Sequence, residues 1–107
     1  MSRNIDLTSI LSTEKPSITI QGKKFTVNDE KSNILRMNST MKKYQESGET
    51  EIEVIDKVLE ILIGKKATQE IDKMGFSFIQ YQEIYFAVMA VVQDESLEVV
   101  KERFRKQ

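Results

Sequence analysis

Residues 76–92 contain a single charged side chain, that of Glu83, and this stretch constrains the fold more than any other part of the chain. Its apolar residues recur at helical spacing and occupy nearly every side of the expected helix. Such a helix needs other elements to cover it. Its longest apolar run, residues 85–92, is far shorter than the roughly 20 residues of a membrane helix. We therefore expect a core helix in a small soluble domain.

The sequence also carries start signals for this helix. Ser77 and Gln80 have the spacing of a capping box, in which each side chain accepts a hydrogen bond from the backbone N–H of the other residue. Phe76 is placed to contact Tyr81 across this start as a hydrophobic staple. A glycine just before it should close a short helix at about residues 68–74.

Two longer helices are expected upstream. From Asn28 or Asp29, either of which can cap a helix, the apolar period changes to about 3.6, and Gly48 suits a left-handed helix end. The apolar stripe of this helix comprises Ile34, Met37, Met41 and Tyr44. The second helix should begin at a capping box in residues 50–53 and end at Gly64. It has a broad apolar face, which includes Ile52, Ile55, Leu59 and Leu62. Such breadth predicts burial against more than one neighbour.

A β-hairpin is expected before the helices, because apolar and polar residues alternate on both sides of the polar segment 21–24. The apolar positions are Ile18, Ile20, Phe25 and Val27. A lone hairpin is marginal in water, so it should rest on helices. Pro16 separates the hairpin from residues 1–15, predicted to be flexible or loosely packed. The expected fold is mainly α (α+β): a small helical bundle with an N-terminal β-hairpin packed on it, one domain spanning residues 16–107.

The composition excludes several kinds of chemistry. The chain has no cysteine and no histidine, which removes disulfides, thiolate metal sites and the commonest general base. Paired carboxylates such as Glu51 and Glu53 lie in first turns of helices, where they favourably meet the helix dipole. The glycines are too widely spaced for a phosphate loop. We therefore expect no enzyme activity, no catalytic residues, no metal and no cofactor.

Nucleic-acid and membrane binding are also disfavoured. The net charge is −1, so no overall field attracts polyanions. Residues 68–92 have the outline of a helix-turn-helix, but the second helix contains no Lys or Arg to contact phosphates. Nothing near the N-terminus has the pattern of an export signal, and we expect a cytoplasmic protein.

Protein binding is the remaining class. Phe78 and Tyr85 lie on a helix that is apolar nearly all round, and a small domain has little surface with which to cover it. A final short helix, capped by Asp94 or Ser96, should carry an apolar stripe. A helix this short is not stable alone in water, so it must dock on another surface. The stripe comprises Leu97, Val100 and Phe104. These five apolar residues are the predicted partner-binding set, with Phe104 as an aromatic anchor.

Residues 59–96 resemble the small tail assembly chaperones of long-tailed phages and prophages of Gram-positive bacteria. The resemblance is carried by residues 62–67 (LIGKKA), 71–77 (IDKMGFS) and 88–94 (VMAVVQD), together with Tyr81 and Ile84. The hairpin at residues 17–25 is similar to that family's opening. Asp94 departs from the pattern, in which glycine is more usual.

The resemblance implies a non-enzymatic chaperone of tail morphogenesis that is absent from the mature virion. Its implied partners are the tape-measure protein, further tail proteins such as tail-tube subunits, and further copies of itself. The family supplies no catalytic residues. The alternative left open by the sequence is a small regulatory domain, either a DNA-binding repressor or a protein inhibitor.

Overall fold

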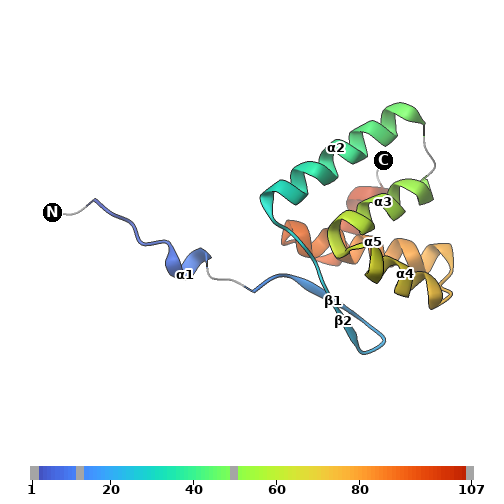
Figure 1. Ribbon diagram of the computed structural model, residues 1–107, viewed down its shortest axis with the longest axis horizontal. Coiled ribbons are helices and arrows are strands. Elements are labelled where there is room, and N and C mark those ends of the chain that lie inside the picture. Colours follow the sequence, from blue (N-terminus) through green and yellow to red (C-terminus); the bar gives the residue numbers. More distant parts are fainter. Residues whose placement is uncertain (1–2, 12–13, 49–50, 106–107) are drawn as a thin grey trace.

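The computed structural model describes residues 3–11, 14–48 and 51–105. Six helices and one two-stranded antiparallel sheet are found in these ranges, and they confirm the predicted mainly α fold with a hairpin (Figure 1). In chain order they are α1 (Thr8–Leu11), β1 (Ser17–Ile20), β2 (Lys23–Thr26), α2 (Lys31–Ser47), α3 (Glu51–Ile63), α4 (Lys65–Lys73), α5 (Phe78–Gln93) and α6 (Leu97–Arg105).

The hairpin turns more tightly than the sequence predicted. Gln21 and Gly22 alone form the turn, and both have positive φ, at 51° and 82°. Two successive residues with positive φ match the right-handed twist of the strands. Lys23 therefore belongs to β2 and pairs with Ile20, while Ile18 pairs with Phe25. This register places Ile18 and Phe25 in the core.

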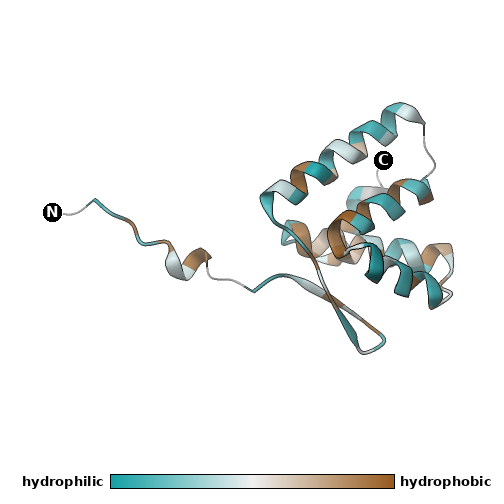
Figure 2. Cartoon of the chain, viewed as in Figure 1, coloured by the Kyte–Doolittle hydropathy of each residue, from teal (hydrophilic) through white to brown (hydrophobic). Residues whose placement is uncertain are grey.

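Helix α3 is the hub of the body, because it packs against α2, α4 and α5. Three neighbours confirm the expectation drawn from its broad apolar face. Helix α5 packs against α3, α6 and β1, and so brings the hairpin onto the helices. Apolar residues concentrate on these inner surfaces (Figure 2). The buried apolar residues are Ile18, Phe25, Val27, Met37, Ile55, Val58, Leu59, Leu62, Ile71, Tyr81, Tyr85, Val88, Met89, Ala90 and Val100.

Two predicted helix starts were wrong. Helix α2 begins after Glu30, because the Asn28 side chain instead accepts a hydrogen bond from the Glu30 N–H in the preceding link. Helix α4 begins at Lys65, directly after Gly64. Thr68 lies inside this helix, and its hydroxyl donates to the Gly64 carbonyl at 2.9 Å.

Other predicted helix starts and ends agree with the structure. The left-handed end at Gly48 is confirmed by its φ of 75°. The capping box of Ser77 and Gln80 is present in full. The Ser96 hydroxyl accepts from the Val99 N–H at 3.2 Å, so Ser96 rather than Asp94 caps α6. The capping box proposed at Thr50 lies outside the described residues.

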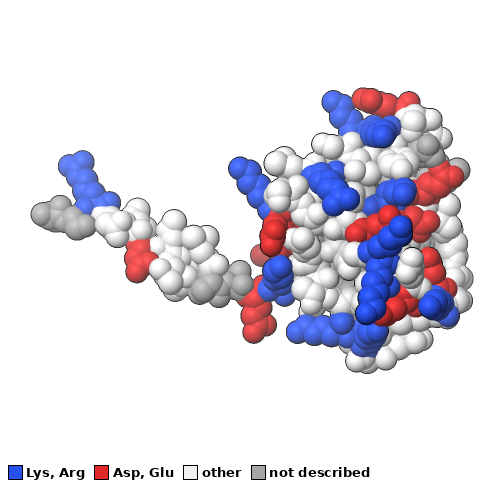
Figure 3. Space-filling model, viewed as in Figure 1, with Lys and Arg blue, Asp and Glu red and all other residues white. Residues whose placement is uncertain are grey.

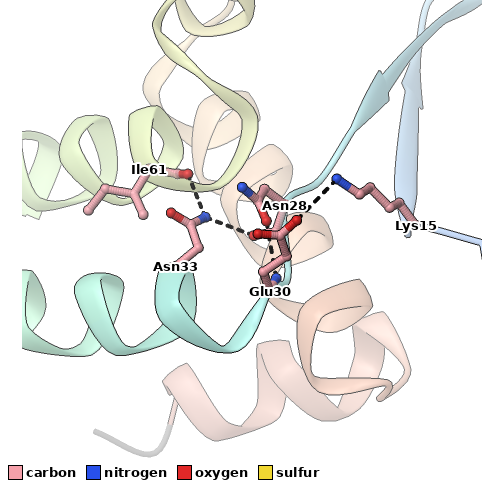
Figure 4. A network of polar contacts seen from close by, with 5 residues as sticks. All are labelled: Lys15, Asn28, Glu30, Asn33 and Ile61. Atoms are coloured by element: carbon pink, nitrogen blue, oxygen red, sulfur yellow. Dashed lines mark hydrogen bonds and ion pairs between the residues drawn. The ribbon is translucent and has the colours of Figure 1, made fainter. Parts of the chain in front are cut away.

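The link between β2 and α2 is fastened to the end of α3 (Figure 4). The buried Asn33 side chain donates to the carbonyls of Asn28 and Ile61, both at 2.8 Å. The Asn28 N–H donates to the Leu62 carbonyl at 2.7 Å. Carbonyls in the last turn of a helix lack partners within the helix, and these bonds satisfy two of them. Lys15 pairs with Glu30 at 3.5 Å beside this junction.

Helix α6 docks on its own domain. Val100 is fully buried, and Lys101 pairs with Glu83 of α5 at 2.8 Å. Arg103 donates to Gln93 at 2.8 Å and to Glu95 at 2.6 Å. Val100, the central residue of the predicted apolar stripe, is thus part of the domain core.

The N-terminal segment projects from the body as an arm (Figure 1), which we define as residues 3–15 without the undescribed residues 12 and 13. Its only regular element among the described residues is the single turn α1. Its four large apolar side chains are all exposed: Ile5, Leu7, Ile10 and Leu11.

Candidate partner-binding site

A pocket of about 210 Å³ opens where the start of α3, the end of α4 and the start of α5 meet, and we call it the α3–α5 pocket. Its described lining is Ile52, Asp56, Ile71, Asp72, Phe76, Ser77, Phe78 and Tyr81. Sites for small molecules usually enclose roughly 300–1,000 Å³. The smaller volume favours a protruding side chain of another protein as the occupant.

Local sequence signals shape this pocket. Gly75 adopts a φ of 71°, and the Ser77 capping box then starts α5. The sharp turn between α4 and α5 therefore holds Phe76 and Phe78 at the pocket. Phe78 is 43% exposed and Ile52, across the pocket on α3, is 46% exposed. Ile52 had been predicted on the buried face of α3, and it instead lies at the rim.

The polar lining is acidic. The Tyr81 hydroxyl donates a hydrogen bond to the Asp56 carboxylate. Burial raises the pKa of Tyr81 above its ordinary value, and the hydrogen bond to Asp56 and the charge of that carboxylate raise it further. Asp72 is exposed on the α4 side, and the described lining contains no Lys or Arg. The pocket can thus hold an apolar side chain with a cation beside it.

The structure divides the predicted partner-binding residues. Phe78 is exposed at the α3–α5 pocket, whereas Tyr85 is 4% exposed and belongs to the core. Burial, with a smaller effect from the charge of Glu51, raises the pKa of Tyr85 to about 12. Leu97 is exposed at the start of α6 and Val100 is fully buried. The side chain of Phe104 lies outside the described residues.

Sequence reasoning missed three exposed apolar residues of the body, one of which is Leu35 on α2. Ile79 follows Phe78 on α5 and is 71% exposed. Val99 on α6 is 49% exposed and borders an open hollow of about 510 Å³. That hollow is also lined by Glu98, Glu102 and Arg103. Val99 is the only apolar side chain in its described lining, whereas Ile52 and Phe78 both border the α3–α5 pocket.

The described part of the chain contains no group of three or more acidic or other metal-ligating residues placed to hold an ion. None of its helices has the length and apolar content to span a bilayer. A scan against protein-family models found no matching family, and searches of curated proteins and of solved structures found no match.

Proposed function

We propose that this chain is a non-enzymatic, cytoplasmic assembly chaperone of phage tails that binds an apolar helical segment of the tape-measure protein. The resemblance of residues 17–25 and 59–96 to such chaperones supports the tail-assembly role. The observation that carries the binding role is the exposed pair Ile52 and Phe78 at the rim of the α3–α5 pocket. Tail-tube subunits are the second proposed client of the same apolar rim.

The pocket suits a helix of a client protein. An amphipathic helix docks through apolar side chains at positions i, i+3 and i+4. One such side chain would enter between Ile52 and Phe78. A Lys or Arg of the client would then face Asp56 and Asp72, giving orientation as well as attraction. The client segment should therefore combine an apolar stripe with a nearby cation.

The test is co-expression with fragments of a tape-measure protein. Phe78→Asp places a charge at the rim and should reduce the soluble yield and the bound fraction of the fragment. Leu35→Asp is the matched control, because Leu35 is 57% exposed on α2 and outside the described pocket lining. Equal protection by both variants would contradict the proposal. Salt-dependent binding of duplex DNA would favour the regulatory alternative instead.

A further inference from the structure

The arm carries an exposed apolar face on one helical turn. The Leu7 carbonyl accepts hydrogen bonds from the N–H groups of Ile10 at 3.0 Å and Leu11 at 2.9 Å. The three side chains therefore lie on one side of a helical turn. The Asp6 carboxylate accepts from both the N–H and the hydroxyl of Thr8, which fixes the start of the turn. The spacing i, i+3, i+4 is that of helices that dock into grooves.

This face contacts nothing that buries it. Leu7, Ile10 and Leu11 are 46%, 67% and 72% exposed. A single helical turn is unstable alone in water, because the conformational entropy lost in nucleating it exceeds the free energy gained from its few hydrogen bonds. Between Asp6 and Glu14 the described residues of the arm carry no charge, whereas mixed charges cover the visible face of the body (Figure 3). We therefore expect the helical turn of the arm to become stable when another surface buries its apolar side chains.

The matching surface lies at the other end of the molecule. In Figure 1 the arm leaves the body on the left, and the junction of α4 and α5, which borders the α3–α5 pocket, lies on the right. The long axis of the chain, arm included, is 59 Å. The arm thus extends away from its own pocket, and the pocket of a second copy can receive it without the arm folding back over the body.

The two surfaces are also complementary in chemistry. The apolar face of the arm matches the exposed side chains of Ile52 and Phe78 at the pocket rim. Arg3 is exposed on the arm, one helical turn's worth of sequence before Leu7. The Asp56 and Asp72 carboxylates of the pocket offer it opposite charge.

We propose that the arm of one copy docks in the α3–α5 pocket of a second copy, so that the protein self-assembles head to tail. The arm and the pocket are different surfaces, so the interface is heterologous and yields a ring or an open chain. The inference rests on the proposed function only in sharing its pocket, since a second copy binds there without any client. A client helix would compete with the arm.

Complementary variants test the head-to-tail geometry directly. Leu7→Asp/Ile10→Asp removes the arm face, and Phe78→Asp removes the pocket rim. Sedimentation velocity should show wild-type assemblies that grow with concentration, and each variant should self-associate at least about thirtyfold more weakly. Mixing the variants should give a 1:1 heterodimer and nothing larger, because one intact arm and one intact pocket remain. Leu35→Asp should assemble like the wild type.

Several results would overturn the inference. These are a wild-type protein that stays monomeric at all concentrations, a variant that assembles normally, and a mixture that remains monomeric. If Phe78→Asp fails to fold, a charge exchange between exposed residues replaces it. Arg3→Glu and Asp72→Lys should each weaken assembly several-fold, and the chain carrying both should recover it. Failure of that double variant to recover assembly would count equally against the inference.

Disulfide trapping distinguishes docking on a second copy from docking on the same chain. The chain has no cysteine, so single cysteines report cleanly. Chains with Leu11→Cys should cross-link to chains with Ile52→Cys far faster than to chains with Leu35→Cys. Equal rates, or an intrachain disulfide at high dilution when Leu11→Cys and Ile52→Cys share one chain, would overturn the inference.

Client protection is measured separately for the same variants. Leu7→Asp/Ile10→Asp keeps the pocket intact and should protect the tape-measure fragment at least as well as the wild type. If assembly does not depend on the arm but Phe78→Asp still loses the client, only the head-to-tail inference fails. If assembly behaves as expected but no variant affects the client, only the proposed function fails.

Discussion

The arm and helix α5 are built from similar apolar side chains, yet they end in opposite surroundings. Val88 is fully buried on α5, a helix that packs against α3, α6 and β1, whereas Ile10 on the arm is 67% exposed. The apolar content of a segment indicates how much of its surface must be buried. The topology determines whether other elements of the same chain bury it. Helix α5 lies among its partners, and the arm lies ahead of the first strand with none beside it.

The largest expected effect is at the buried end of this comparison. Val88→Asp places an unpaired charge in the core and should lower the free energy of unfolding by more than about 4 kcal/mol. Ile79→Asp on the same helix is the control and should change it by less than about 0.5 kcal/mol, because Ile79 is 71% exposed. Urea denaturation measures both. A cooperative, unshifted transition for Val88→Asp would show that α5 is misplaced.

Alkaline pH should act on the core but leave the arm untouched. The folded pKa of Tyr85 is raised to about 12 by burial, while an unfolded tyrosine titrates near 10. The resulting stability is fully present below pH 10 and is lost as pH rises toward 12. A shift of this size corresponds to about 2–3 kcal/mol. Unfolding measured between pH 8 and 12 should be less steeply pH-dependent in Tyr85→Phe, and an unchanged slope would exclude Tyr85 as a source.

A smaller loss is expected at the junction that joins the hairpin to the helices. Asn33→Leu removes a donor from the carbonyls of Asn28 and Ile61 and should cost about 1–3 kcal/mol. Asn38→Leu, at an exposed position of the same helix, is the matched control. Thermal denaturation compares the two. Equal melting temperatures would mean that water satisfies these carbonyls as well as Asn33 does.

The smallest expected effect is on the stability of the arm variant. Leu7→Asp/Ile10→Asp should change the unfolding free energy of the isolated chain by less than about 0.5 kcal/mol, because both side chains are exposed. The measurement is made at concentrations below those at which the wild type assembles. A loss comparable to that of Asn33→Leu would show that the arm packs on its own body.

The sequence predicted local structure better than contacts between distant segments. The hairpin, the Gly48 helix end and the Ser77–Gln80 capping box follow from residues close together in the chain, and all three are confirmed. The role of Asn33 depends on Ile61, which is far away in sequence and carries no complementary pattern. Thr68 looked like a helix start, but Gly64 already provided the necessary turn.

The structure places the predicted partner-binding residues in different surroundings. The apolar surplus on α5 led to the prediction of both Phe78 and Tyr85 as partner-binding residues; Phe78 is exposed, whereas α5 turns Tyr85 into the core. Helical periodicity predicts which residues share a face of a helix. It does not predict how far along that helix the neighbouring helices extend. Ile52 lies near the start of α3, where the covering helices leave it at a rim. The exposure of Ile52 could therefore be seen only from the packing of the helices.

The fastening of the Asn28 N–H to the Leu62 carbonyl has a consequence for hydrogen exchange. Asn28 belongs to no helix or strand, yet its amide can exchange with solvent only when the hairpin link separates from the end of α3. The amides of Ile10 and Leu11, although helical, lie on an isolated turn that opens readily. In deuterated solvent the irregular link should thus retain its proton long after the helical arm has lost its own.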